Sequence, residues 1–329
     1  MRHDCREIPD ETREIDFADC NTLTCRTILS QHDAIYNQIW ALETYTTNGR
    51  QYLVSASNDD KVKVWDLTKN KLATSLKGHK GSVNALALYV KNGVQMLASA
   101  SYNKVNLWDL STNTYVRTLS DHHGMISSLV AYKRKGKSML ACGSWGKTIK
   151  IWDLDKYKLT AVLPGHADCV RSMCVYHQNG KSYLASGSCD KTIKIWSLDD
   201  YTLVTDLHKD TSEIYAMVLL DHNGQQILAS GHIDGKIKLF SLEQRICVGI
   251  INAHTNRILT LEVSYCNGKV CLVSSGFDRA IKVWDLDSRS EIAFVKSDAD
   301  IYSIRAFMNG NRACLASGDG NDDIKLWME

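Results

Sequence analysis

Histidine, serine and aspartate recur together along the chain, and serine hydrolases use these residues as base, nucleophile and orienting group. The fullest set is His166, Ser186 and Asp190, in the segments PGHADCV and LASGSCDKTIKIW. Similar sets recur at one register in several places, whereas an active site is a single asymmetric arrangement. The sequence also contains no GxSxG, Walker, HExxH or kinase signature. We therefore interpret these residues as structural and expect no enzymatic activity.

The eleven cysteines give little support for a metal or disulfide site, because their number is odd and no two are spaced as CxxC. Most lie in apolar segments, where a reduced cysteine behaves as a small hydrophobic residue. His122 and His123 are adjacent, but a structural histidine beside an exposed one is a simpler interpretation than a metal pair without a third ligand. We expect no metal, no cofactor and a reducing compartment.

Seven short segments of one pattern provide the frame for these residues. They are VKVWDL, VNLWDL, IKIWDL, IKIWSL, IKLFSL, IKVWDL and IKLWME, with the aromatic residues Trp65, Trp108, Trp152, Trp196, Phe240, Trp284 and Trp327. These aromatic residues are 43 or 44 residues apart. In the spacing of these aromatic residues, and in the segment that ends each repeat, the chain resembles the WD-repeat (WD40) family over residues 24–329. The resemblance implies an all-β fold, a seven-bladed propeller with four strands in each blade.

Turn residues divide each repeat into strands. Short runs rich in β-branched and aromatic residues alternate with turns, and the first turn of nearly every repeat is Asn-Gly, a strong hairpin signal. The predicted blades are approximately residues 35–76, 83–119, 126–163, 170–207, 214–251, 258–295 and 301–329. The last blade is one strand short, so we expect residues 24–30 to complete it and close the ring. The propeller then comprises residues 23–329, with residues 1–22 outside it.

The resemblance also implies a buried polar set in each blade: a histidine before the first strand, a serine in the second, an aspartate in the following turn, and the tryptophan. A buried indole N–H needs an acceptor, and a histidine–aspartate contact fixes the loop. The residues at the histidine and aspartate positions are His79, His122, His166 and His254, and Asp59, Asp190, Asp234 and Asp278. Blades 3, 5 and 7 depart from this pattern, so we expect them to be held less firmly.

Composition and charge exclude several functional classes. The 329 residues carry a formal net charge of +2, so no overall field directs the chain to nucleic acid or to an anionic membrane. The N-terminal segment MRHDCREIPDETREIDFADC is charged and has no apolar region, and no apolar run approaches the roughly 18 residues of a membrane span. We expect a soluble cytoplasmic or nuclear protein. A basic cluster is interpreted as a solvated hairpin tip: Lys133, Arg134, Lys135, Lys137, Lys156 and Lys158.

Residues that depart from the repeat are candidates for binding, because the loops of a rigid scaffold carry its function. Large residues in the turns before the third strands, together with residues near the starts of the innermost strands, would surround the channel mouth. The candidates are Tyr36, Tyr102, Trp145, Arg171, Tyr215, Ile233, Arg257, Phe277 and Tyr302. Tyrosine, tryptophan and arginine commonly dominate protein interfaces. Trp40, by contrast, is expected in the core.

These residues predict a non-enzymatic scaffold or adaptor that binds a peptide or protein as part of a larger complex. A substrate-recognition subunit of a ubiquitin ligase or a chromatin complex is an alternative that the resemblance allows. Phosphopeptide-reading adaptors of that type carry several arginines at the channel mouth, whereas only Arg171 and Arg257 lie there in this sequence. A propeller hydrolase or isomerase is a further alternative, with blade 3 as its place. The aromatic residues could also do no more than cap neighbouring loops.

Overall fold

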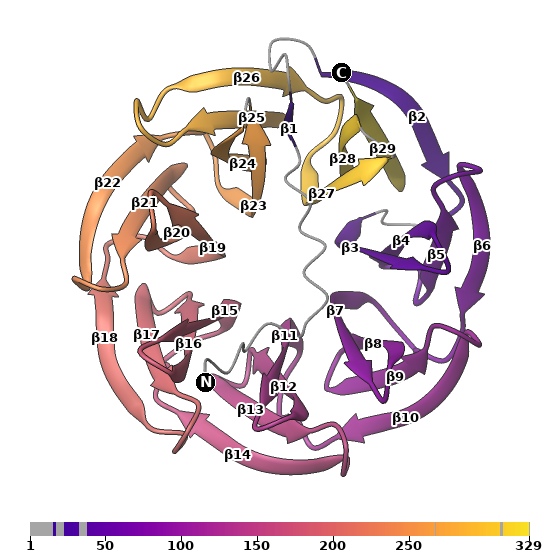
Figure 1. The fold of residues 1–329 in the computed structure, drawn as a ribbon, viewed down its shortest axis with the longest axis horizontal. Coiled ribbons are helices and arrows are strands. Elements are labelled where there is room, and N and C mark those ends of the chain that lie inside the picture. The colour runs from indigo at the N-terminus through magenta and orange to yellow at the C-terminus, as the bar shows by residue number, and fades with distance from the viewer. Residues whose placement is uncertain (1–15, 18–22, 33–37, 267, 310–311, 329) are drawn as a thin grey trace, which may run out of the picture.

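The computed structural model describes residues 16–17, 23–32, 38–266, 268–309 and 312–328. Within these residues every regular element is a β-strand, and the strands form seven sheets arranged in a ring around a central axis (Figure 1). The predicted all-β, seven-bladed propeller is therefore confirmed.

Each blade has four antiparallel strands, ordered from the axis outward (Figure 1). The innermost strands are β3 (Ile39–Thr47), β7 (Val83–Lys91), β11 (Ile126–Arg134), β15 (Val170–Gln178), β19 (Ile214–His222), β23 (Ile258–Cys266) and β27 (Ile301–Asn309). The second strands are β4 (Arg50–Ser57), β8 (Val94–Ser101), β12 (Lys137–Ser144), β16 (Lys181–Ser188), β20 (Gln225–His232), β24 (Lys269–Gly276) and β28 (Arg312–Asp319).

The two outer layers complete the blades. The third strands, which carry the repeated tryptophans, are β5 (Val62–Asp66), β9 (Lys104–Asp109), β13 (Thr148–Asp153), β17 (Thr192–Ser197), β21 (Lys236–Ser241), β25 (Ala280–Asp285) and β29 (Asp323–Met328). The outermost strands are β6 (Lys71–Leu76), β10 (Thr114–Ser120), β14 (Lys158–Pro164), β18 (Leu203–Lys209), β22 (Ile246–Asn252), β26 (Glu291–Lys296) and β2 (Thr24–Ser30).

The strand β2 closes the ring. It pairs antiparallel with β29, with Cys25 opposite Trp327 and Leu29 opposite Ile324. Leu29 is buried in a core cluster that also contains Leu42 and Trp65 of the first blade. Backbone hydrogen bonds thus place the N-terminal strand in the last blade, and apolar packing joins that blade to the first, so the two ends of the chain close the ring.

Two residues of the N-terminal extension belong to a blade. The short strand β1 (Asp16–Phe17) pairs in parallel with the end of β23, opposite Tyr265 and Cys266. We expected residues 1–22 to lie outside the ring, and for these two residues that expectation is wrong. The physical reason is that an innermost strand has an unpaired inner edge, whose N–H and C=O groups can accept one more strand.

The core lies between neighbouring blades. For example, Val64 and Leu76 of the first blade share a buried cluster with Leu97 and Trp108 of the second. Along the inner wall, Arg305 forms ion pairs with Glu43 (3.0 Å) and with Glu262 (3.2 Å), and so connects the seventh blade to both of its neighbours. The predicted Asn-Gly hairpins are present, as at Asn48 and Gly49, where φ is 50° and 69°.

Candidate functional site

All seven innermost strands have a β-bulge at their second residue, where the register shifts by one. A bulge re-aims the side chain of its extra residue. The bulged residues are Trp40, Asn84, Ser127, Arg171, Tyr215, Leu259 and Tyr302. They lie at the end of the ring where the innermost strands begin and the second strands end, which we call the top face.

On the top face, two arginines alternate with aromatic rings. The guanidinium carbon of Arg171 lies 5.0 Å from the ring centre of Trp145 and 4.8 Å from that of Tyr215. The guanidinium carbon of Arg257 lies 5.7 Å from the ring of Tyr215 and 4.8 Å from that of Phe277. These distances are within the range of cation–π attraction, so three rings hold two cations in place.

The contacts continue around the axis through aromatic pairs. Phe277 and Tyr302 meet edge to face with ring centres 5.6 Å apart, and Tyr302 meets Trp40 in the same way at 5.0 Å. The side-chain N–H of Gln38 donates to the hydroxyl of Tyr302 (3.0 Å), and the indole N–H of Trp40 donates to the side-chain oxygen of Asn58 (2.6 Å). We call the connected set the belt: Trp145, Arg171, Tyr215, Arg257, Phe277, Tyr302 and Trp40.

The structure brings six of the nine predicted binding residues into the belt. Tyr36 lies outside the described residues. Tyr102 is 56% exposed and covers Gly81, where an added Cβ would lie 2.1 Å from its ring. Ile233 is half-buried in a turn whose N–H donates to the carbonyl of Glu213. Tyr102 and Ile233 take no part in the ring contacts that define the belt.

Trp40 is the belt residue that sequence reasoning misplaced. We expected Tyr36 at this position and Trp40 in the core, but β3 begins at Ile39 and Trp40 is its half-buried bulged residue. Four positions separate His166 from the start of β15, whereas seven separate His32 from the start of β3. Because more residues separate His32 from β3, blade 1 was aligned with the other repeats at the wrong position. Counting back from Trp65 to the innermost strand would have placed Trp40 at the bulge.

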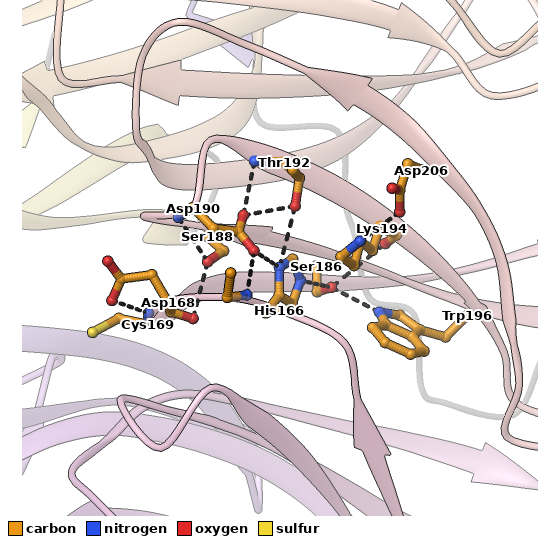
Figure 2. Close-up of polar contacts among 11 residues, drawn as sticks. His166, Asp168, Cys169, Ser186, Ser188, Asp190, Thr192, Lys194, Trp196 and Asp206 are labelled. Carbon is orange, nitrogen blue, oxygen red and sulfur yellow. Dashed lines mark hydrogen bonds and ion pairs between the residues drawn. The ribbon is translucent and has the colours of Figure 1, made fainter.

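Figure 2 shows the polar set of blade 4. Nδ1 of His166 donates to Asp190 (2.8 Å), and the indole N–H of Trp196 donates to Oγ of Ser186 (2.8 Å). Because the indole can only donate, the Ser186 hydroxyl gives its own proton to Nε2 of His166 (2.7 Å). Burial would raise the pKa of Asp190, but hydrogen bonds from His166 and Thr192 outweigh it and hold that pKa well below its usual range.

This set is built for stability and not for catalysis. Ser186 is fully buried and its oxygen is already engaged by Trp196 and His166. A nucleophile must reach substrate. Every anchor tryptophan is similarly buried, at 6% exposure or less: Trp65, Trp108, Trp152, Trp196, Trp284 and Trp327.

Blades 1 and 6 contain the same arrangement. In blade 6, His254 contacts Asp278 (2.8 Å) and Ser274 (2.7 Å), and Trp284 donates to Ser274 (2.8 Å). In blade 1, Asp59 and Ser55 contact His32 at 2.8 and 2.7 Å. His32 was not among the predicted histidines, for the same reason of loop length that misplaced Tyr36.

Blade 5 builds a related set from different positions. Asp210 occupies the histidine position, and His232 at the end of β20 contacts both Ser230 (2.7 Å) and Asp210 (3.4 Å). Lys238 also pairs with Asp210. Asp234, which we expected in this set, is exposed and pairs with Lys236 (3.3 Å), so that expectation is wrong. Asp210 stands at the position that His166 has in blade 4, and the imidazole of the set comes from His232. Asp234 therefore takes no part in this set.

Blades 2, 3 and 7 keep only part of the set. In blade 2, His79 contacts Ser99 (2.7 Å), which accepts from Trp108 (2.7 Å). In blade 3, the indole of Trp152 donates directly to Nε2 of His122 (3.2 Å), since Cys142 replaces the serine. Burial lowers the pKa of both His79 and His122 to about 4. 

In blade 7, Trp327 donates to Ser317 (2.7 Å), and Lys325 pairs with Asp319 (2.9 Å). Ser297 takes the histidine position and contacts Lys325 at 3.5 Å. Blade 7 thus has a serine in place of the histidine of the complete blades, and the carboxylate that pairs with Lys325 comes from the end of β28.

The predicted basic hairpin serves partly to connect blades. Lys133 donates to the carbonyl of Val90 (3.0 Å) in the second blade. Arg134 donates to the hydroxyl of Tyr201 (2.7 Å) in the fourth, and its guanidinium carbon lies 4.6 Å from that ring. Both cations therefore have acceptors within the protein.

Comparison with known proteins adds one positive result. The family described as WD domain, G-beta repeat matches residues 23–66, 70–109, 113–153, 157–197 and 245–285. No curated protein matched the chain. Across the described part of the chain, no three His, Cys, Asp or Glu side chains are grouped to hold a metal ion, and no helix is long and apolar enough to span a membrane.

Proposed function

The chain belongs to the WD-repeat family, and on this basis we propose that it is a scaffold that binds a peptide or protein partner on its top face. Propellers of this family typically act as non-enzymatic platforms for protein interaction. Within that general role, the belt is the surface that best supports a specific partner site.

The observation that carries the proposal is the continuity of the belt. Its seven side chains come from six of the seven blades and contact one another without a gap from Trp145 to Trp40. Trp145, at one end, is 43% exposed. Rings and guanidinium groups that are already held in place lose little freedom on binding, which favours affinity.

Among the described residues, most of the other exposed large apolar side chains lie on the outermost strands. Tyr115 (53% exposed) and Phe294 (61% exposed) lie on the outermost strands β10 and β26 of different blades. Single exposed apolar side chains of this kind are usual on a soluble protein. They provide matched controls for the belt.

The test is affinity purification of the tagged protein from its native source. The double variant Trp145→Ala with Tyr215→Ala should keep its circular dichroism spectrum and lose the partner that the unaltered protein captures. The double variant Tyr115→Ala with Phe294→Ala removes as much exposed aromatic surface from the rim and should retain that partner. Retention of the partner by the belt variant would contradict the proposal.

A further inference from the structure

We propose that Arg171 and Arg257 bind two carboxylates of an acidic peptide segment. This inference rests on the proposed function, because it states the chemistry of the partner that the belt binds. Among the described residues, neither guanidinium has a carboxylate within ion-pair distance. Arg171 donates only from Nε, to the sulfur of Cys189 (3.3 Å), and Nε of Arg257 is buried without a hydrogen-bond partner.

Some other arginines of this chain have oxygen acceptors. Arg305 pairs with Glu43 and Glu262, and Arg279, on the same face as the belt, pairs with Asp300 (3.3 Å). A guanidinium has five donors, and leaving them unpaired in a partly buried place is costly. Aromatic rings thus hold the two belt arginines in place, and among the described residues their guanidinium N–H groups have no oxygen acceptor. These N–H groups can therefore donate to an anion.

The spacing of the two arginines fits one extended peptide. Both guanidinium carbons contact the same ring, at 4.8 and 5.7 Å from the centre of Tyr215. An extended peptide advances about 3.3 Å per residue, so acidic residues two or three positions apart span about 7–10 Å. One segment can therefore place a carboxylate at each guanidinium while its backbone crosses the Tyr215 ring.

The surrounding charges favour a carboxylate over a phosphate. In blades 5, 6 and 7 the residue before the innermost strand accepts a backbone hydrogen bond from the turn opposite, and these residues are Glu213, Arg257 and Asp300. Arg257 is therefore flanked by two acidic positions on the same rim. Two carboxylates balance the two guanidinium groups, whereas two phosphates would bring nearly two further negative charges to the rim that holds Glu213 and Asp300.

The test begins with selection from a library of random short peptides displayed on phage. The unaltered protein should enrich peptides with two Asp or Glu residues two or three positions apart. Arg171→Gln and Arg257→Gln should each reduce the enrichment at least tenfold, as loss of a charged hydrogen bond implies. Arg279→Gln removes the same charge from the same face but from a guanidinium that is already paired, and should leave enrichment unchanged.

A second measurement separates the sources of the anion. The most enriched peptide is synthesised with its acidic residues, with the matching amides, and with phosphoserine, and binding is followed by fluorescence polarisation. The acidic form should bind about tenfold more tightly than the amide form, and the phosphoserine form no more tightly than the acidic one. Tighter binding of the phosphoserine form would overturn the choice of carboxylate.

The possible failures are distinguishable. Peptides that lose binding with Trp145→Ala and Tyr215→Ala but show no acidic preference would overturn this inference and leave the proposed function standing. Selection that yields no peptide dependent on the belt would contradict both. Arg257→Lys gives a further check, because lysine keeps the charge but loses the planar donor pair, and should weaken binding of the acidic peptide less than Arg257→Gln does.

Discussion

Blades 4 and 5 are neighbours that hold the same buried groups in different ways. Blade 4 takes a histidine from the loop before β15 and an aspartate from the turn after β16. Blade 5 takes the aspartate from the loop, as Asp210, and the histidine from the end of β20, as His232. The two blades also contribute adjacent members of the belt, Arg171 and Tyr215.

The two blades indicate that the residues that hold the loops and the residues of the belt are different sets. In blades 4 and 5 a carboxylate, an imidazole and a hydroxyl meet, although the carboxylate and the imidazole come from exchanged positions. Four belt residues, Arg171, Tyr215, Tyr302 and Trp40, are the bulged residues of innermost strands, and these bulges occur whether or not a blade has the usual set. Variants of the polar sets should therefore lower stability without altering partner binding, and belt variants should do the reverse.

The largest effect is expected in blade 4. Asp190→Ala removes the acceptor of the buried His166 and the hydrogen bonds that Asp190 receives from Ala167 and Thr192. Breaking a buried network of this kind should lower the free energy of unfolding by about 2–3 kcal/mol. Urea unfolding followed by tryptophan fluorescence measures it, and a loss below about 0.5 kcal/mol would show that the set does not hold the blade.

A smaller effect is expected for the exchanged carboxylate of blade 5. Asp210→Asn keeps the shape of the side chain and its backbone hydrogen bond but removes the charge that faces Lys238 and His232. The free energy of unfolding should fall by about 1–2 kcal/mol. If the urea midpoint did not move, Asp210 would have no structural role and blade 5 would be held by packing alone.

The stability of blade 5 should also depend on pH. Burial lowers the pKa of His232 to about 4, below the ordinary value near 6.5 that it has in the unfolded chain. Between these values the unfolded state binds more protons, so stability falls as pH falls, by about 1 kcal/mol for this residue from pH 6.5 to 5.5.

Asp190 stays charged between pH 6.5 and 5.5. The ordinary pKa of an aspartate already lies below this range, and the pKa of Asp190 in the folded protein is lower still. Urea unfolding at a series of pH values should show that His232→Asn removes part of the slope, while the slopes from His79 and His122 persist. An unchanged slope in His232→Asn would mean that His232 has the same pKa in the folded and unfolded states and would contradict its lowered pKa.

The smallest effect is expected for Asp234. Asp234 is exposed, and its carboxylate pairs with the side chain of Lys236 and accepts a hydrogen bond from the backbone N–H of the same residue. Surface pairs of this kind contribute little, so Asp234→Ala should change the free energy of unfolding by less than about 0.5 kcal/mol. Equal losses from Asp234→Ala and Asp190→Ala would contradict the distinction between the two blades.

Much of the fold could be predicted because it repeats. Seven aromatic anchors at one spacing and an Asn-Gly turn in nearly every repeat define strands and blades, and β2 follows from the strand missing at the end. The prediction was wrong where one blade changes a loop length or a position. The three additional residues between His32 and β3 hid both His32 and Trp40, and the exchange of Asp210 and His232 made Asp234 look structural.

The candidate site was less accessible to sequence reasoning for a different reason. The residue types of the belt stood out, but which of them touch depends on bulges and on blade curvature that no local pattern encodes. Tyr102 and Trp145 occupy the same position in consecutive blades, yet only Trp145 has an arginine, Arg171, beside it in the next blade. The contacts that define the belt are visible only in the three-dimensional structure.

Photo-cross-linking in the native source tests the central claim most directly. Trp145 on the belt and Tyr115 on the outer rim, 43% and 53% exposed, are each replaced by benzoylphenylalanine, and adducts are identified by mass spectrometry after irradiation. Position 145 should yield an adduct with one partner, which disappears when Tyr215→Ala is added, and position 115 should yield none with that partner. An adduct of that partner from position 115 alone would place the binding surface on the rim and contradict the account.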